Sequence, residues 1–417
     1  MSLITNKLTE LRDWVDDRFP LMSLWDDHLA KYYAPKNFNF WYYFGALSLV
    51  VFVIQVLTGI FLVMNYKPDA ATAFGSVEYI MRDVEWGWLI RYLHSTGASA
   101  FFIVIYLHMM RALLYGSYKQ PRELVWILGM CLYLALMAEA FMGYLLPWGQ
   151  MSFWGAQVII SLFGAIPVIG GTLAEWIRGD YVVSDITLNR FFSLHVIALP
   201  FAIAGLVFLH IIALHEVGSN NPDGVDIKKK KDENGKPLDG IPFHPYYTVK
   251  DLVGLTVFLI LFSAVVFFGP EMGGYFLEAN NFIPANPMST PQHIAPVWYF
   301  TPYYSILRAN TINFLWIDAK VWGVVFMGLG VLSFFFLPWL DRSPVRSIRY
   351  RGGLYKTALT VFIICFLILG YLGVQPPTET KTLVAQVCTV IYFLFFLLMP
   401  IYTKLDKTKP VPERVTM

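Results

Sequence analysis

Four histidines lie in two pairs inside apolar stretches, His94 with His108 and His195 with His210. A strongly polar residue at membrane depth is costly and usually functional, and imidazole is the commonest metal ligand in proteins. The first pair is 14 residues apart. On a helix this spacing spans about 21 Å, which fits inside a hydrocarbon core about 30 Å thick. Each pair can therefore place one ligand toward each face of a membrane.

The helical phase of the two pairs favours haem iron between them. A separation of 14 residues brings both rings to within about 40° of one helix face, so two such helices could hold two stacked haems. The second pair is 15 residues apart and misses whole turns by about 60° in the opposite sense. We expect a π-bulge near Pro200 to absorb the extra residue, because proline already interrupts the helical hydrogen bonds there.

Glycine repeats the same spacing in two other apolar segments. Gly45 and Gly59 are 14 residues apart, and so are Gly129 and Gly143. A residue without Cβ lets a bulky group approach a helix backbone closely. A lone membrane histidine is more often a packing residue, and paired glycines more often mark helix contacts. Neither interpretation explains one spacing on four segments, so we expect a four-helix bundle that holds two haems.

Composition places the whole chain in a membrane. Of its 417 residues, 57% are hydrophobic and only 14% are charged, far from the balance of soluble proteins. The predicted fold is an all-α integral membrane protein with eight transmembrane helices, of which helices 1–4 hold two stacked b-type haems. The predicted spans are 41–64, 89–114, 124–146, 190–214, 249–268, 320–340, 356–374 and 383–403.

The same runs predict how the chain is organised. The amino-terminal segment carries Leu8, Leu11, Trp14 and Val15 in an amphipathic pattern, which is typical of a helix lying on a membrane surface. The predicted regions are a cytoplasmic segment 1–40, the haem-binding bundle 41–216, a cytoplasmic loop 217–248, a second four-helix region 249–405 and a cytoplasmic tail 406–417.

Basic residues predict the orientation. With the amino terminus inside, inside segments hold 21 of the 31 Lys and Arg residues and outside segments hold eight. The positive-inside rule then places both termini in the cytoplasm or an equivalent compartment. The run Lys228–Lys231 is most simply part of this signal, so no nucleic-acid partner is expected.

Two long connections fall on the predicted outer side, at 147–189 and 269–319. Loops of this length are usually functional, and these two can jointly form one pocket. We expect short interfacial helices in the first. The three cysteines, Cys131, Cys365 and Cys388, lie in apolar helices and form no C-x-x-C-H motif. The haems are therefore expected to be bound non-covalently, and this chain carries no iron–sulfur cluster of its own.

Helix direction assigns the histidines to two haems. Helices two and four both run from outside to inside, so the outer haem takes His94 and His195 and the inner haem takes the other pair. Arg91 lies one turn before His94, and Arg111 lies three residues after His108. These arginines are placed to pair with haem carboxylates at each face, or simply to reach the interface, and the two interpretations are compatible.

Longer motifs follow one another along the chain. They are Arg91–His94, Gly143–Gln150, His215–Pro222, Ile241–Tyr247, Phe282–Pro287 and Trp298–Phe300. In sequence and order they resemble cytochrome b, the membrane core of the ubiquinol–cytochrome c reductase (cytochrome bc) complex. The resemblance runs from about residue 30 to 405, and the unsplit chain is more similar to the respiratory bacterial form than to the photosynthetic one.

The resemblance implies a function that suits the predicted geometry. Quinol would be oxidised at the outer face and quinone reduced at the inner face, with electrons crossing through a low-potential outer haem and a high-potential inner haem. It implies proton translocation by a Q cycle, and electron delivery to a Rieske iron–sulfur protein and a c-type cytochrome. It also implies a homodimeric complex in the bacterial inner membrane, in contact with lipid.

The family motifs imply an inner quinone site. A quinone that is being reduced needs a hydrogen-bond donor at each carbonyl and a nearby proton source, and His215 and Asp251 suit that role. Without the resemblance, a histidine at a helix carboxyl end and an aspartate at a helix amino end could simply complement the helix dipole. The implied residues are His215, Ser219, Asn221, Lys250 and Asp251.

The motifs also imply an outer quinol site, and here the chain departs from the family. The family commonly has a glutamate between Pro296 and Trp298 that accepts a quinol proton, whereas this chain has Val297, which cannot. The implied lining is Phe141, Tyr144, Gly155, Pro296, Trp298, Tyr299 and Tyr304.

Another group must then accept the quinol proton. Glu139 lies one turn before Gly143 on the outer half of helix three, where a carboxylate is costly to keep. We hypothesise that it is the acceptor, with Glu271 at the start of the long outer loop as the second candidate. The alternative is that Glu139 pairs with a neighbouring polar side chain.

Two other classes of membrane protein are weighed against this interpretation. A haem-containing anchor of a dehydrogenase would pass electrons to quinone, but such anchors tend to be shorter and need no outer quinol pocket. A secondary transporter would show interrupted helices in symmetry-related positions, and the sequence contains no such repeat.

Overall fold

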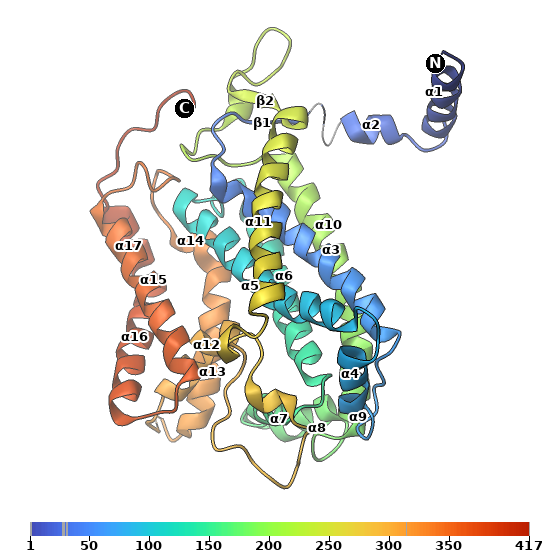
Figure 1. Ribbon diagram of the computed structural model, residues 1–417. Helices are drawn as coiled ribbons and strands as arrows, with labels where there is room; N and C mark the ends of the chain where they lie inside the picture. Colours follow the sequence, from blue (N-terminus) through green and yellow to red (C-terminus); the bar gives the residue numbers. More distant parts are fainter. Residues whose placement is uncertain (1, 27–29, 31, 314, 417) are drawn as a thin grey trace.

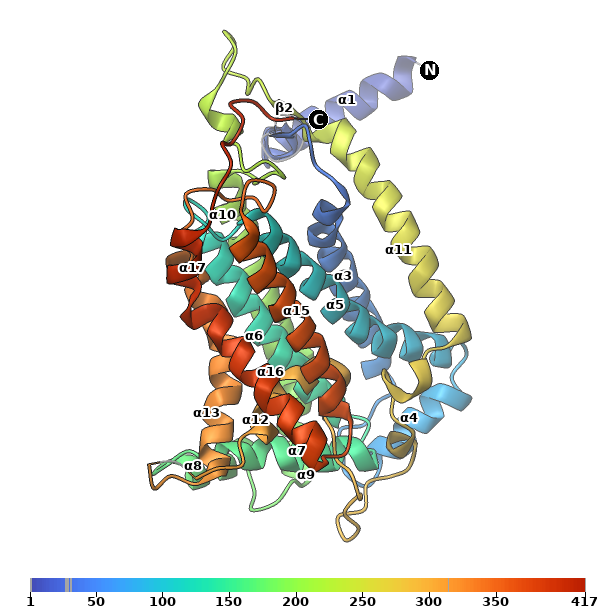
Figure 2. The same cartoon turned by 90° about the vertical axis from the view of Figure 1, so that its left-hand side faces the viewer.

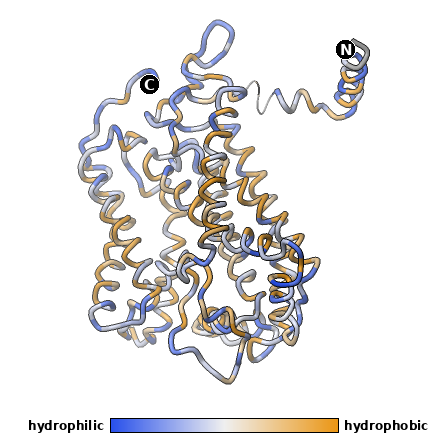
Figure 3. The backbone as a smooth tube through the Cα atoms, in the orientation of Figure 1, coloured by the Kyte–Doolittle hydropathy of each residue, from blue (hydrophilic) through white to orange (hydrophobic). Residues whose placement is uncertain are grey.

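The protein is an all-α membrane protein, described here from a computed structural model that covers residues 2–26, 30, 32–313 and 315–416. Among these residues, eight helical segments are long and apolar enough to cross a membrane, as predicted. Figure 3 shows hydrophobic residues along the helices and hydrophilic residues in the loops at both ends. The helices at their centres are α3 (Tyr43–Val63), α5 (Gly87–Tyr115), α6 (Glu123–Leu145), α10 (Leu199–Val217), α11 (Thr248–Phe268), α13 (Ala319–Leu332), α15 (Gly353–Val374) and α16 (Glu379–Leu397).

The first four spans form two closely packed helix pairs, α3 with α5 and α6 with α10. Each pair joins one helix that carries the spaced glycines to one that carries the spaced histidines. The fifth span, α11, packs on α3 and α5 and lies along the outside of this bundle (Figures 1 and 2). Pairing a glycine helix with a histidine helix brings the two repeats face to face.

The fourth span contains the irregularity that the histidine spacing predicts. Residues Leu194–Ala198 form one turn of π-helix between α9 (Asp185–Ser193) and α10, and the turn ends two residues before Pro200. A π-turn takes in one extra residue, which corrects the phase of a 15-residue separation. The span also begins earlier than predicted, because residues from Asp185 onward are already helical, with the hydroxyl of Thr187 accepting the Ser184 N–H at 3.1 Å.

The two long outer loops lie together at the end of the bundle opposite the termini (Figure 1). The Gln150 N–H donates to the Ile283 carbonyl at 3.0 Å, and Gly149 and Pro284 form an antiparallel bridge. This contact joins segments more than 130 residues apart. The short helices expected in the first loop are present, whereas a helix in the second was not foreseen. The helices on this side are α4 (Ala73–Arg82), α7 (Gln150–Phe163), α8 (Gly170–Arg178) and α12 (Thr301–Ala309), with 3-10 turns at Met272–Gly274, Ala279–Phe282 and Trp298–Phe300.

The opposite end carries both termini and a two-stranded sheet (Figure 1). Strand β1 (Tyr33–Pro35) pairs antiparallel with β2 (Gly240–Pro242), which ties the amino-terminal segment to the loop that follows α10. Helices α1 (Ser2–Asp16) and α2 (Leu21–Trp25) project sideways from the bundle, and Leu8, Leu11 and Trp14 on α1 are exposed. The remaining helical turns are Phe40–Tyr42, Ile227–Lys229, Phe243–Tyr247, Ser333–Phe336, α14 (Leu337–Leu340) and α17 (Met399–Leu405).

Tyrosine hydroxyls connect the bundle to the carboxyl-terminal helices. The Tyr106 hydroxyl donates to the Tyr299 carbonyl at 2.6 Å and lies 3.1 Å from the Tyr133 hydroxyl, which itself donates to that of Tyr303. Around them α12 packs on α13, α15 and α16. The tyrosines satisfy one another's polar groups in an apolar interior, where an unpaired hydroxyl would be costly.

A buried ion pair fixes the loop after α14. Asp341 pairs with Arg351, and both side chains are 0% exposed. Lys119 approaches the same carboxylate at 3.2 Å, and the Tyr118 hydroxyl donates to it at 2.8 Å. Burial alone would raise the pKa of Asp341, but the two cations hold that pKa below its usual value. Asp341 is therefore held as the anion that neutralises a buried guanidinium.

Replacing Asp341 by alanine should destabilise the protein by about 3–5 kcal/mol, because it leaves a buried charge without its partner. The measurement is thermal unfolding of the purified protein. The control is Glu78→Ala, which removes the exposed ion pair between Glu78 and Arg82 and should cost about 0–1 kcal/mol. Equal losses in the two variants would contradict this assignment.

Candidate functional site

Each of the four histidine rings rests against one of the four spaced glycines. The closest contact joins α6 to the fourth span, where a Cβ on Gly143 would lie 2.3 Å from Cε1 of His195. No real side chain can occupy that position, so only glycine admits the ring. The other pairs are Gly59 with His94, Gly45 with His108 and Gly129 with His210, each with Cε1 3.3 Å from the position of such a Cβ. The sequence predicted a close approach at these glycines, and the approaching group is the histidine ring.

The histidines then meet across the bundle in the predicted pairs. The ring centres of His94 and His195 are 6.2 Å apart, and those of His108 and His210 are 6.5 Å apart. Metal–imidazole bonds of about 2.0–2.1 Å place the centres of two opposed imidazole rings about 6–6.5 Å apart. Both pairs therefore fit an iron ion held between two imidazoles.

Hydrogen bonds fix which nitrogen of each outer histidine is free. The single proton of the Thr58 hydroxyl goes to the Ile54 carbonyl at 2.6 Å, so its oxygen accepts from Nδ1 of His94 at 2.9 Å. Nδ1 of His195 faces two acceptors of Glu139, the backbone carbonyl at 2.9 Å and the carboxylate Oε1 at 3.0 Å. Both rings are thus protonated on Nδ1, which leaves the Nε2 lone pair for a metal.

An arginine accompanies each histidine pair, as predicted from the sequence. Arg111 lies against the Tyr42 ring at 5.0 Å, and its buried Nε has no hydrogen-bond partner among the described residues. Arg91 lines the cavity that contains His94 and His195. A buried guanidinium with an unused donor suits a carboxylate ligand, as haem carries.

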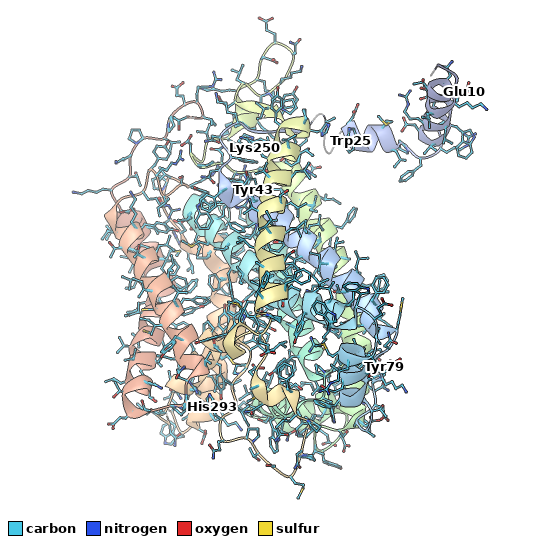
Figure 4. The ribbon with its side chains drawn as sticks, viewed as in Figure 1. Glu10, Trp25, Tyr43, Tyr79, Lys250 and His293 are labelled. Carbon is cyan, nitrogen blue, oxygen red and sulfur yellow. The ribbon has the colours of Figure 1, made fainter. Side chains whose placement is uncertain are left out.

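The inner histidine pair opens into a cavity of about 500 Å³ that reaches the end of the bundle where the termini lie. Lys250 and Tyr43, both of which line it, lie toward that end in Figure 4, whereas His293 lies toward the other. Its lining brings together four of the five residues predicted for quinone reduction. They are His215, Ser219, Lys250 and Asp251.

Tyr32, which no sequence motif singled out, joins this group. Its ring meets that of His215 edge-on, with centres 4.7 Å apart, and its hydroxyl lies 3.0 Å from the Ser219 hydroxyl. Lys228, from the basic run, donates to the His215 carbonyl at 3.2 Å and to that of Glu216 at 2.8 Å. It therefore caps the carboxyl end of α10.

Asn221 does not line the inner cavity. Its amide accepts from the Asp223 and Val225 N–H groups and donates to the Val225 carbonyl, so its side chain holds the turn after α10. The neighbouring Asn220 lines the cavity instead, and its buried Oδ1 has no hydrogen-bond partner within the described part of the chain. A run of two asparagines gives no sequence signal for which one turns inward.

The outer histidine pair opens into a second cavity, of about 340 Å³, at the end formed by the long loops. Val297 is buried and lines it, as do Tyr144 and Tyr299. The Tyr299 ring stacks on Phe102 with centres 3.9 Å apart, and Phe276 comes from the second loop. This cavity is largely apolar, as quinol binding requires.

Other residues predicted for the outer site support this cavity without lining it. Gly155 lies beside Tyr144, since a Cβ there would lie 3.6 Å from the Tyr144 ring. The indole of Trp298 donates to the hydroxyl of Ser99, a lining residue, at 3.1 Å, and Pro296 precedes Val297.

Phe141 and Tyr304 lie outside the outer cavity. Phe141 packs on Phe191 of α9 with ring centres 5.3 Å apart, because this side of α6 faces the short outer helices. The Tyr304 hydroxyl donates to the Ile294 carbonyl at 3.3 Å. The Arg308 guanidinium lies over the Tyr304 ring, 4.8 Å from the ring centre. Both side chains therefore make packing contacts elsewhere in the protein and do not border the outer cavity.

Three outer carboxylates differ sharply in their surroundings. Glu139 lines the cavity but contacts His195, which is the polar pairing weighed above as the alternative. Glu271 is exposed and does not line the cavity. Glu278, which the sequence analysis missed, accepts from the Tyr144 hydroxyl at 2.8 Å through Oε2. A signal was available, because Glu278 is the one carboxylate between residues 272 and 317.

Comparison with known proteins identifies the family of this chain. Residues 29–218 match the family described as cytochrome b/b6/petB, and residues 284–393 match cytochrome b (C-terminal)/b6/petD. The chain belongs to the cytochrome b family. A cytochrome b of Allochromatium vinosum is 62% identical over 412 residues, covering 98% of this chain and 99% of the relative. One of Rhodospirillum rubrum is 49% identical, covering 97% of this chain and 95% of the relative.

A solved structure titled "Hyperthermophilic respiratory Complex III" has the same fold, with a TM-score of 0.86 and 38% identity, covering 94% of this chain and 98% of that one. As a cytochrome b, the chain is a haem-binding, multi-pass membrane protein of electron transport. It is the membrane core subunit of a quinol–cytochrome c oxidoreductase complex. The predicted family, fold and enzyme class are therefore confirmed.

Replacing Gly143 by alanine should remove haem from the outer position, because the new Cβ would overlap the His195 ring. The measurement is the b-haem content of the purified complex from its visible spectrum, with an expected loss of about half. The control is Gly205→Ala on α10, where a Cβ meets no atom within 4 Å. Full haem content in the Gly143 variant would contradict the conclusion that only glycine at this position leaves room for the His195 ring.

Proposed function

We propose that this cytochrome b oxidises quinol at its outer face and reduces quinone at its inner face, with electrons crossing through two bis-histidine b haems. The observation that carries the proposal is that each histidine pair opens into its own cavity, one at each end of the bundle. The inner cavity reaches His215 and Asp251, and the outer one reaches Tyr144 and Tyr299.

The four histidines and two arginines are the residues that would hold the haems. When bound, the haems supply one-electron carriers between the two cavities. The chain itself packs each histidine ring against a glycine, keeps Nε2 of both outer histidines free to bind a metal, and places an arginine beside each histidine pair. Apolar helices around the bundle keep water from this path.

At the inner face the chain supplies donors and a proton route. His215, Lys250 and Asp251 lie on two helices that border one cavity, so groups of both charges face a single quinone. Tyr32 packs on His215 and orients it, since the ring contact and the bond to Ser219 hold Tyr32 in place. A quinone that gains electrons there would take protons from the inner side.

At the outer face we assign the proton acceptor to Glu278. Val297 cannot accept a proton, and the Glu139 carboxylate is directed at His195. Glu278 lies in the second outer loop, bonded to the cavity residue Tyr144. Burial raises the pKa of Glu278 above its usual value, and the hydrogen bond from Tyr144 offsets only part of that. A carboxylate with a raised pKa is a better base near neutral pH.

The partners follow from the chemistry and from named relatives. Quinol gives up two electrons, and only one of them is to cross the bundle. The other needs an outer acceptor, which we propose to be a Rieske iron–sulfur protein that passes it to a c-type cytochrome. A relative from Bradyrhizobium diazoefficiens, 46% identical, is named "Cytochrome b/c1", and this chain matches 56% of its length. That name supports a c-type partner, which we place on the outer side, and we propose that the assembled complex is a homodimer.

The orientation completes the proposal. The excess of Lys and Arg on the side of the termini supports a cytoplasmic location for both ends, with the chain in the bacterial inner membrane. Quinol oxidation then releases protons outside, and quinone reduction takes them up inside, so the Q cycle would translocate protons. The lipid-facing helices and the amphipathic α1 would contact the membrane.

The first test is a potentiometric titration of the visible spectrum in membranes that contain the complex. Two b-type components of distinct potential are expected, because the two histidine pairs have different surroundings. A single component would contradict one of the two haem sites. No b-type haem at all would overturn the proposal.

Replacing Glu278 by glutamine should slow quinol oxidation by about 10²-fold, as expected for loss of a general base. In the unsubstituted protein the rate should fall as the pH drops through the raised pKa of Glu278, because only the deprotonated carboxylate accepts a proton. The variant should lose this pH dependence. The measurement is the pH profile of quinol-dependent cytochrome c reduction.

The control is Glu175→Gln, which neutralises an exposed carboxylate on α8 and should leave the rate unchanged. A slow Glu271→Gln variant beside a normal Glu278→Gln variant would move the acceptor to the start of the loop. An unchanged rate and pH profile in Glu278→Gln would contradict the assignment.

A further inference from the structure

The residues that accompany the spaced glycines on α3 and α6 also occur in pairs 14 residues apart, but the two members of each pair differ in polarity. Glu139 lies four residues before Gly143, and Val125 lies four residues before Gly129. On α3, Thr58 directly precedes Gly59 and Phe44 directly precedes Gly45. The outer position therefore has glutamate and threonine where the inner position has valine and phenylalanine.

This difference reaches the histidines directly. Nδ1 of His195 lies 3.0 Å from Oε1 of Glu139, and Nδ1 of His94 lies 2.9 Å from the Thr58 hydroxyl. The second carboxylate oxygen, Oε2 of Glu139, is buried and has no hydrogen-bond partner in the described structure. The side chain is therefore committed to the histidine and not shared with a cation.

Among the described residues, no carboxylate or hydroxyl group accepts a hydrogen bond from either inner histidine. Nδ1 of His108 and Nδ1 of His210 are buried without a well-formed hydrogen bond to any described residue, although the backbone of Val125 approaches His210. The charged group close to both inner rings is the cation Arg111. Arg91 plays the corresponding part for His94, so the carboxylate is the component found on the outer side alone.

We propose that Glu139 lowers the reduction potential of the outer haem through its hydrogen bond with His195. A carboxylate that accepts from the far nitrogen of a metal-bound imidazole makes that ligand more basic, and hydrogen bonding around axial ligands tunes haem potential. A more basic ligand stabilises ferric over ferrous iron. Glu139 is thus a positioning and tuning residue for the ligand. This inference rests on the proposed pair of b haems.

The consequence is a directional path. A lower potential at the outer haem and an unmodified one at the inner haem make electron transfer from outside to inside favourable. Glu139 would then add to the driving force in this direction, at a position where the inner half of α6 has Val125. It also explains why a carboxylate is kept at membrane depth although Glu278 serves the outer cavity.

The test is a redox titration of both b components in the assembled complex with Glu139→Gln. The outer component should shift upward by about a tenfold change in its one-electron equilibrium constant, which is about 59 mV, while the inner one stays unchanged. The low-temperature electron paramagnetic resonance signal of the outer ferric haem should move as well, since its ligand has changed. Glu139→Asp, which keeps a carboxyl group at this position, should restore part of the shift.

The matched control is Glu123→Gln, which removes a carboxylate from the start of the same helix and should move neither potential. The reciprocal variant is Val125→Glu, which supplies the inner His210 with the outer arrangement and should lower the inner potential. If the Glu139→Gln variant does not bind haem, the inner potential of the Val125→Glu variant tests the proposal instead.

An outer potential unchanged in Glu139→Gln, or an equal shift of both components, would overturn the proposal, and so would an unchanged inner potential in Val125→Glu. These outcomes leave the proposed function intact, because the unsubstituted complex still shows two b components. One component in the unsubstituted complex would instead refute the proposed haem pair itself.

Discussion

The haem bundle depends on the contact between each histidine ring and the glycine opposite it. A Cβ at Gly143 would lie 2.3 Å from the His195 ring, so any other residue would push the ring out of its place between the helices. With the rings in place, the ring centres of the two histidine pairs are 6.2 and 6.5 Å apart, which leaves space for an iron ion between the rings of each pair. The packing of α3 on α5 and of α6 on α10 is therefore set by the smallest side chain, and the position of the metal ligands follows from it.

Around this common frame the two faces of the membrane are built differently. At the inner end, β1 pairs with β2 and brings Tyr32 beside His215, so a segment before the first span completes a cavity that the first five spans line. At the outer end, Gly149 meets Pro284 and the two long loops close over the bundle. The haem positions share one design, whereas each substrate cavity is assembled from segments distant in sequence. This division suits opposite reactions on a shared electron path.

Much of the fold could be predicted because its signals are periodic. The eight spans, the histidine pairing and even the π-turn before Pro200 follow from spacing on a helix of fixed pitch. The site predictions were less complete for side chains in irregular backbone. Asn221 holds a turn while Asn220 lines the cavity, and Tyr304 bonds to a loop carbonyl. Helix α12 and the bond between Glu278 and Tyr144 were missed, because no local pattern encodes a contact across 134 residues.

Eight membrane spans and two histidine pairs at matched depths can be predicted from the order of residues alone, because hydrophobic length and helical pitch are properties of single segments. Which groups meet those histidines, and which carboxylate lies in which surroundings, depends on how the segments pack. Glu139 and Glu278 are both acidic residues on the outer side, yet one faces His195 and the other faces Tyr144. That difference arises from the packing of α6 against the fourth span and the second outer loop, and long-range packing cannot be read from the local order of residues.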